Sequence, residues 1–413
     1  MERKKFDLNF RLVIISKIIS VVGGNVLGFA MILFLVDFTG SAALLGIISA
    51  VSQIPTVILT PFSGMIADRM DKKKLIIMFD VMTALTNFYF LWLLVTGSYT
   101  ILNITILRMA KISINVFAGT VFNAAVPRIV DEEQLVAANG ALQSIAAIGL
   151  IGGSVIGGIL FGVVDLQVIA LGSGIVFLIS ASISTFIRIP YVKQKIVGGM
   201  LQTVKADMSE SFKFLKNEKP IIFKLALVSA TITFLFPPIF NIGLPFIVDV
   251  IFEQPVTLSF GIAAIGMLAG GILAGRLTKY LAIKHFAKWV VGIGATGILL
   301  ALAFTTILPN LSVSFWLFNF TLALLLFIFA LLNSGMGAFM QKEVPEQILG
   351  KVNSLLGMMS LIAGPLGILA VGFFIETIDL PLFFLGITAV TWVLAAICSR
   401  VLKNYLKHVK GEN

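Results

Sequence analysis

The chain has 413 residues, of which 58% are hydrophobic and 12% are charged, and its formal net charge is +10. A soluble chain of this length would form two or three domains, and soluble domains are about 25% charged, so 50 charged residues are too few to coat them. The same composition excludes intrinsic disorder, and a single cysteine, Cys398, excludes a disulfide scaffold. The sequence therefore predicts an integral membrane protein.

Twelve apolar runs follow one another along the chain, each long enough to cross a bilayer as a helix. The alternating segments of about ten residues that a membrane β-barrel needs do not occur. The first run follows a basic N-terminus and has no small-residue cleavage site, so we expect an uncleaved span. The predicted fold is all-α, with spans at residues 12–36, 41–66, 75–96, 100–124, 138–163, 167–188, 221–248, 256–279, 287–308, 312–340, 352–375 and 380–400.

The connection between the sixth and seventh spans is the longest, and it contains six lysines and three acids. Its position after six spans and before six more predicts three parts of the chain. These are an N-terminal six-helix bundle (1–188), a cytoplasmic linker (189–220) and a C-terminal six-helix bundle with a short basic tail (221–413). Three short matches in the same order, at offsets of 207 to 213 residues, indicate that the bundles are parallel, pseudo-symmetric repeats. The matching pairs are 64–69 with 271–276, 34–37 with 246–249, and 133–135 with 346–348.

The basic residues predict the topology of the spans. In a soluble protein a charge of +10 would suggest nucleic-acid binding, but in a membrane protein Lys and Arg gather on the cytoplasmic side. With the N-terminus inside, 28 of the 30 basic residues fall in inner segments. The charged residues of the expected outer loops are all acidic. We therefore expect a multi-pass protein of the cell membrane with both termini in the cytoplasm. Nucleic acid is not an expected partner.

The most specific motif is Gly64-Met-Ile-Ala-Asp68-Arg69-Met-Asp71-Lys72-Lys73-Lys74, in the loop between the second and third spans. It resembles the signature loop of the major facilitator superfamily, with Asp71 in place of the usual second glycine, and the whole string is similar to the macrolide-efflux branch of its drug exporters. The resemblance implies a fold of two six-helix bundles. It also implies a conformational latch on the cytoplasmic face, formed by Gly64, Asp68, Arg69, Lys72 and Lys73. The alternative is a basic loop that only sets topology.

A glycine-rich run in the fifth span is similar to the antiporter motif of the exporting members, although Ser154 stands where that motif has proline. Glycines four residues apart also let two helix backbones approach closely, so plain helix packing is the alternative. The motif glycines are Gly149, Gly153, Gly157 and Gly158.

Polar residues inside the spans are candidates for a central cavity and for coupling. Arg108 and Lys111 lie one turn apart in the fourth span, and Arg108 matches the arginine that helps proton coupling in the family. The alternatives are snorkelling of the basic side chains and ordinary interhelical hydrogen bonds of the amides. The candidate amides are Asn25, Asn115, Asn241 and Asn319, with Asn123 and Asn333.

The acids limit the coupling mechanism. Asp37 and Asp249 are expected at the outer ends of the first and seventh spans, where they could attract a cation or a proton, or be solvated surface groups. Asp80 is expected about one turn into the third span, and no acid falls at an expected midplane. Pro237-Pro238 should kink the seventh span.

The resemblance predicts a secondary exporter of amphipathic or hydrophobic, macrolide-like compounds that works by alternating access, in exchange for protons. An exporter or flippase for a lysolipid or a siderophore-like metabolite stays open, as does a receptor or assembly protein that transports nothing. No enzymatic activity, cofactor or metal site is expected, because the sequence has no Walker A motif and its two histidines are far apart. The expected partners are the substrate and the bilayer, and a monomer is expected.

Overall fold

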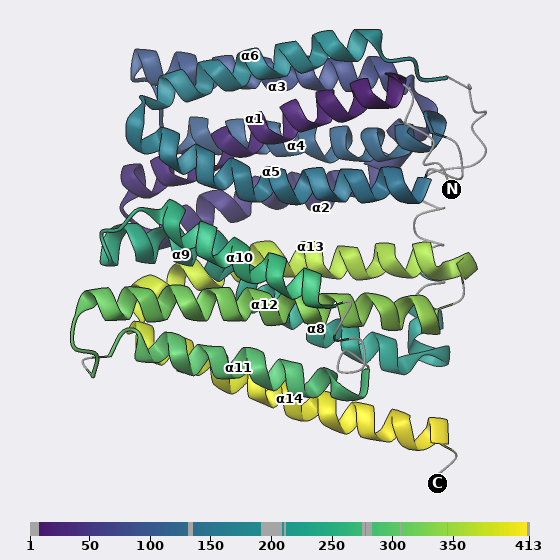
Figure 1. Cartoon of the computed structure of the whole chain (residues 1–413), viewed down its shortest axis with the longest axis vertical. Helices are drawn as coiled ribbons and strands as arrows, with labels where there is room; N and C mark the ends of the chain where they lie inside the picture. Colours follow the sequence, from purple (N-terminus) through teal and green to yellow (C-terminus); the bar gives the residue numbers. More distant parts are fainter. Residues whose placement is uncertain are drawn as a thin grey trace. The chain divides into compact units, whose positions relative to one another are not determined.

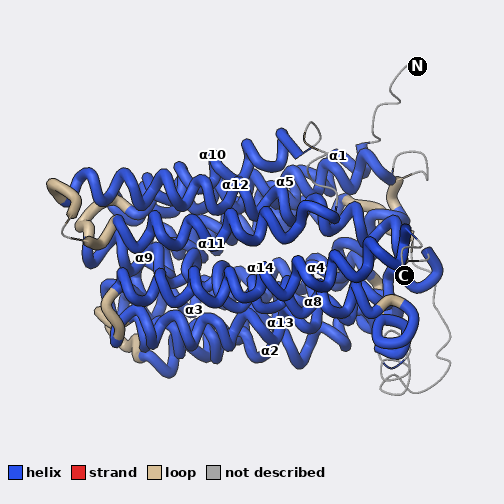
Figure 2. The backbone as a smooth tube through the Cα atoms, turned by 90° about the horizontal axis from the view of Figure 1, so that it is seen from below, coloured by secondary structure: helices blue, strands red, loops and turns tan. Residues whose placement is uncertain are grey.

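The computed structural model describes residues 8–130, 135–190, 209, 212–274, 277, 283–305, 307–344 and 346–410. In those ranges the regular structure is helical throughout and contains no strand (Figure 2). The prediction of an all-α membrane fold is confirmed. The chain forms two compact units, of which the first comprises Met1–Gly40 and Ile48–Met200 and the second comprises Ser41–Ile47 and Leu201–Asn413.

Six long helices make up most of the first unit (Figure 1). Asp71 caps the third of them, because its side chain accepts hydrogen bonds from the backbone amides of Lys73 and Lys74. Gly97 ends that helix in the left-handed conformation at φ 64°. The helices are α1 (Leu8–Thr39), α2 (Ala42–Arg69), α3 (Lys72–Thr96), α4 (Ile101–Ala125), α5 (Leu135–Val163) and α6 (Leu166–Phe186), with a 3₁₀ turn at Val126–Arg128.

The second unit contains α8 (Pro220–Pro238), the short α9 (Leu244–Phe246), α10 (Val256–Ala274), α11 (Phe286–Leu302), α12 (Leu311–Glu343), α13 (Glu346–Thr377) and α14 (Leu380–Lys410). A 3₁₀ turn at Ile283–His285 precedes α11, and π-helical turns lie at Phe214–Glu218, Ile239–Gly243 and Ile247–Ile251. Two of the π turns follow Pro237 and Pro238, and together with α9 they continue the seventh span to Ile251. Because proline has no backbone N–H, it interrupts the α-helical hydrogen-bond pattern, and the backbone continues here in wider π turns. This is the span in which we expected a kink.

The same pattern of neighbouring helices recurs in each unit. In the first, α1 packs on α5 and α6, and α3 packs on α6 and α4. In the second, α8 packs on α13 and α14, and α11 packs on α14 and α12. Figure 1 shows α11 beside α14 and α3 beside α6. This pattern supports the two repeats inferred from the sequence.

Eleven helices in the described ranges are long and apolar enough to cross a membrane. The remaining expected span, 138–163, falls on α5, whose described apolar segment, Gly152–Val163, is shorter than the others. The structure therefore yields eleven spans by length and hydropathy, against twelve expected, with a long helix at the twelfth position. The expected linker, 189–220, lies mostly outside the described residues.

Candidate transport site

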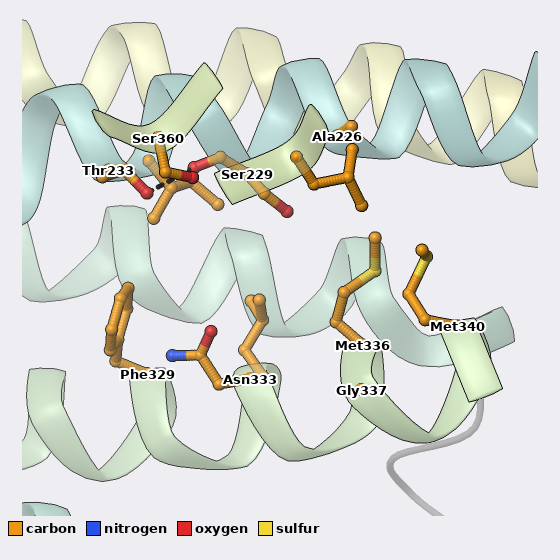
Figure 3. Close-up of a pocket in the computed structure, with 12 residues that line it drawn as sticks. Ala226, Ser229, Thr233, Phe329, Asn333, Met336, Gly337, Met340 and Ser360 are labelled. Carbon is orange, nitrogen blue, oxygen red and sulfur yellow. Dashed lines mark hydrogen bonds between the residues drawn. The ribbon is translucent and has the colours of Figure 1, made fainter. Parts of the chain in front are cut away.

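The second unit contains a cavity of about 330 Å³ between α8, α12 and α13. Figure 3 shows side chains from these helices pointing into it, with Phe329, Asn333 and Met336 from α12 opposite Ser229 and Thr233 from α8. The Thr233 hydroxyl donates to the Ser229 carbonyl within its own helix at 2.9 Å. This leaves the cavity with a mixed apolar and hydroxyl lining.

The composition of this lining fits an amphipathic ligand. Met336, Met340 and Phe329 provide flexible and aromatic apolar surface, which adapts to ligands of different shape. Asn333 and Ser360 provide hydrogen-bonding groups, and the lining residues that the structure describes include no charged side chain. Of the asparagines that the sequence singled out, Asn333 is the one found in this lining.

Arg108 and Lys111 lie on α4 of the first unit, both half-buried. The Lys111 ammonium donates to the Met31 sulfur at 3.9 Å, which is a weak interaction. The Arg108 Nε is buried and has no hydrogen-bond partner among the described residues. Two cations one turn apart repel each other, so this part of α4 is suited to an anionic group or a carbonyl oxygen.

The glycine motif of the fifth span packs α5 on α1. A Cβ placed on Gly149 would collide with Val21, and one placed on Gly153 would collide with Asn25. A Cβ on Gly157 would lie 2.6 Å from the carbonyl oxygen of Val26. The motif is therefore a stripe of close backbone contact, as the packing alternative predicts. A role in transport direction stays a prediction.

The second unit repeats this arrangement between α13 and α8. A Cβ on Gly367 would collide with the Phe234 carbonyl and lie 2.9 Å from Pro238. Because Pro238 has no backbone N–H, it cannot bond the Phe234 carbonyl in the α-helical pattern. A Cβ on Gly364 would meet nothing within 4 Å, so Gly367 makes the close contact.

The other candidate cavity residues occupy varied environments. Asn319 is fully buried and its side-chain amide donates to the Phe315 carbonyl of its own helix, whereas Asn115 and Asn241 are exposed. Asp37 is exposed near the end of α1, and Asp249 is half-buried in a π turn.

The first unit contains a buried polar cluster that the sequence did not predict. Asp80 lies on α3, eight residues and about 12 Å along the helix axis after Lys72, the first residue of the helix. Ser180 of α6 donates to its carboxylate at 2.7 Å, and Ser20 of α1 lies 3.5 Å from it. Lys17 interacts electrostatically with Asp80, and its ammonium lies 4.4 Å from the centre of the Phe122 ring.

Comparison with known proteins identifies the family. Residues 13–368 match the sequence profile of the Major Facilitator Superfamily. The chain belongs to this superfamily of membrane transporters. It is 26% identical over 399 residues to macrolide efflux protein A of Streptococcus pyogenes, covering 96% of both chains. It is 27% identical over 333 residues to macrolide efflux protein A of Enterococcus faecalis, covering 80% of this chain and all of that one.

Solved structures of other transporters share the fold. The nucleoside transporter NupG (D323A mutant) matches with a TM-score of 0.73 and 16% identity, over 96% of this chain and all of that one. A bacterial homologue of the iron transporter ferroportin, in its inward-facing state, matches with a TM-score of 0.71 and 18% identity, over 95% and 98%. At these identities the likeness concerns the fold alone.

The facilitator signature loop joins α2 to α3. Gly64 is half-buried near the end of α2, and a Cβ there would meet nothing within 4 Å. Lys72 is buried, and the Lys73 ammonium donates to the Thr185 carbonyl of α6 at 2.5 Å. The side chains of Asp68 and Arg69 lie outside the described residues. The latch stays a prediction.

Proposed function

We propose that this facilitator exports amphipathic small molecules across the cell membrane by alternating access, in exchange for protons. The main support is the match to proteins named for macrolide efflux, which covers 96% of this chain for one relative and 80% for another. The cavity of the second unit adds independent support, because its Met, Phe, Ser and Asn side chains suit a ligand with both apolar and hydrogen-bonding surface.

Arg108 and Lys111 favour a cargo with carbonyl or anionic groups. A guanidinium cannot release a proton near neutral pH, so Arg108 acts through its field or its donors. Its unpartnered Nε supports a role as a hydrogen-bond donor to such a group. A macrolide lactone offers carbonyl and hydroxyl oxygens of this kind.

The charges support an orientation with both termini in the cytoplasm. The start of α3 and the end of α14 are both rich in lysine, and Lys and Arg are retained on the cytoplasmic side. Asp68 and its neighbours would then latch the halves on that side. A carboxylate near a helix N-terminus is stabilised by roughly 0.3–1 kcal/mol, enough to bias two conformations that differ little in free energy.

The direct test is the accumulation of a labelled macrolide in cells with and without the protein, each with and without a protonophore. We expect expressing cells to accumulate less macrolide than cells without the protein. The protonophore should raise their accumulation to the level of cells without the protein. An Asp68→Asn variant expressed at the same level serves as the control and should export several-fold more slowly. Equal accumulation with and without the protein, in the presence and absence of protonophore, would reject macrolide export.

Two alternatives give different results in the same cells. A lysolipid or siderophore-like cargo would leave macrolide accumulation unchanged and alter the export of that compound. A receptor or assembly protein would change the accumulation of none of them. The unpartnered Arg108 Nε and the mixed lining of the cavity favour a transporter over a filled, apolar centre.

A further inference from the structure

Asp80 is unusual among the acids that the structure describes. Each of the others lies in a loop or within one turn of an element's end, whereas Asp80 lies eight residues after Lys72 at the start of α3. A carboxylate at this depth costs free energy unless it is paired, hydrogen-bonded or functional. Its surroundings therefore indicate which of these applies.

Four serines join Asp80 to the end of α6, and we call them the serine row: Ser16 and Ser20 on α1, and Ser180 and Ser184 on α6. The Ser180 hydroxyl lies 2.7 Å from Asp80 Oδ2, 2.6 Å from the Ser20 hydroxyl and 2.9 Å from the Ser16 hydroxyl. The Ser16 hydroxyl lies 3.0 Å from that of Ser184. The path from Asp80 through Ser180 and Ser16 to Ser184 is thus continuous.

The serine row leads from Asp80 to the basic end of the unit. Ser184 lies two residues before the end of α6, and one turn before Arg188, whose backbone N–H donates to Asn9 at 2.7 Å. Ser16, Ser180 and Ser184 are each at most 2% exposed. The path is therefore shielded from the lipid along its length.

The chemistry of hydroxyl groups allows two orientations of this path. An ionised Asp80 only accepts, so Ser180 donates to it, Ser16 donates to Ser180 and Ser184 donates to Ser16. A protonated Asp80 can donate to Ser180, and every hydrogen bond in the path then reverses. The two orientations differ by one proton and use the same oxygen positions.

Among the described residues, one charged group interacts with Asp80. Lys17 of α1 is the charged group that interacts with it among the described residues of α1, α3, α4 and α6. The ammonium lies over the Phe122 ring of α4, where it retains a partner whichever form the carboxyl takes. Neutralising Asp80 therefore does not leave Lys17 without a favourable contact.

We propose that Asp80 binds the exchanged proton and that Ser180, Ser16 and Ser184 conduct it between Asp80 and the inner end of the first unit; the proposal rests on the proposed proton exchange. In release, the Asp80 O–H bond breaks as Ser180 takes the proton. Ser180 passes its own proton to Ser16, Ser16 passes its own to Ser184, and Ser184 passes its own to water. One proton moves, each hydroxyl keeps its composition, and Asp80 is left ionised.

The first test needs no substrate. Difference infrared spectroscopy of the purified protein, taken through a drop in pH, should show the carbonyl band of a newly protonated carboxyl group. We expect this band to disappear in Asp80→Asn and to shift in Ser180→Ala, which removes a hydrogen bond from the carboxyl. A band that persists unchanged in Asp80→Asn would overturn the proposal.

Ser173→Ala is the matched control. Ser173 is also a buried serine of α6 and also joins three helices, since it accepts from Asn87 and donates to the Gly23 carbonyl, but it is not part of the path. It should leave the carboxyl band in place. If Ser173→Ala shifts the band as much as Ser180→Ala does, the serines serve helix packing and the conduction path is rejected.

The second test measures flux in proteoliposomes with an entrapped pH dye and a labelled macrolide. Asp80→Asn should lose proton-driven transport by tenfold or more and keep macrolide exchange, which moves no net proton, and Ser184→Ala should slow only the driven mode. Wild-type proton flux in Asp80→Asn, or equal loss of both modes in it, would overturn the assignment. Proton exchange itself fails separately, if the wild-type protein moves macrolide with no proton flux.

Discussion

Gly157 of α5 lies so close to Val26 of α1 that a β-carbon at position 157 would stand 2.6 Å from the Val26 carbonyl oxygen. Gly149 and Gly153 continue this stripe along α5 toward Val21 and Asn25. In the second unit Gly367 meets Phe234 and Pro238 in the same way. Gly367 stands 214 residues after Gly153, and Phe234 and Pro238 stand 213 residues after Val21 and Asn25. The two units thus share a close helix contact that only glycine permits.

Enlarging Gly157 should destabilise the first unit. We expect Gly157→Ala to cost about 1–3 kcal/mol of packing free energy, because the carbonyl it would strike is backbone and cannot rotate away. The melting temperature in detergent should fall, and export should fall with it. Gly152→Ala is the control on the same helix, since a Cβ there meets nothing within 4 Å. Equal melting temperatures for the two variants would contradict the packing account.

Arg108 gives a prediction with two outcomes of different meaning. Arg108→Ala removes both the charge and the donor, whereas Arg108→Lys keeps the charge and loses the planar fork. We expect Arg108→Ala to abolish driven efflux, and Arg108→Lys to restore it only if the role is electrostatic. Downhill equilibration of the same substrate and surface expression are measured beside it. Wild-type rates in Arg108→Ala would reduce the residue to a snorkelling anchor.

The cavity of the second unit should control which compounds are carried. Asn333→Leu removes hydrogen-bonding groups from its lining, so we expect polar macrolides to be exported several-fold less well than apolar dyes. Trp316→Ala is the control on the same helix, because Trp316 is 57% exposed and lies outside the cavity lining. An unchanged ratio of macrolide to dye export in Asn333→Leu would exclude the cavity from substrate selection.

The topology can be checked by labelling with a membrane-impermeant thiol reagent. Single cysteines at the exposed positions Ser98, Val163 and Asn310 should react from outside, and one at Lys216 only from inside. Cys398 is buried, so the wild-type chain serves as the blank. Reaction of the Lys216 position from outside intact cells would refute the proposed orientation.

Much of the fold could be predicted from the sequence, because every backbone group in a membrane must be paired within a helix and each span needs about 20 apolar residues. Helix ends were less predictable. The third span begins at Lys72, three residues before the expected start, since Asp71 caps it and the lysines extend the helix beyond its apolar part.

The site was less predictable, because the partners of a buried polar group come from other helices. Nothing near Asp80 in the sequence shows that Ser20 and Ser180 lie beside it. The pairs Ser16/Ser20 and Ser180/Ser184, each one turn apart, are the pattern that could have revealed the cluster. The asparagines predicted the site poorly, because Asn319 and Asn241 each donate to a backbone carbonyl four residues earlier in their own span and not to another helix.

Transport by everted membrane vesicles tests the central claim most directly. Respiration acidifies the interior of such vesicles, so an exporter that exchanges its cargo for protons should accumulate a labelled macrolide inside them and release protons as it does so. We predict that a protonophore abolishes this uptake. Vesicles that contain the Asp68→Asn variant should take up the macrolide several-fold more slowly. Uptake equal to that of vesicles without the protein, or uptake that persists at full rate with the protonophore, would contradict proton-coupled export.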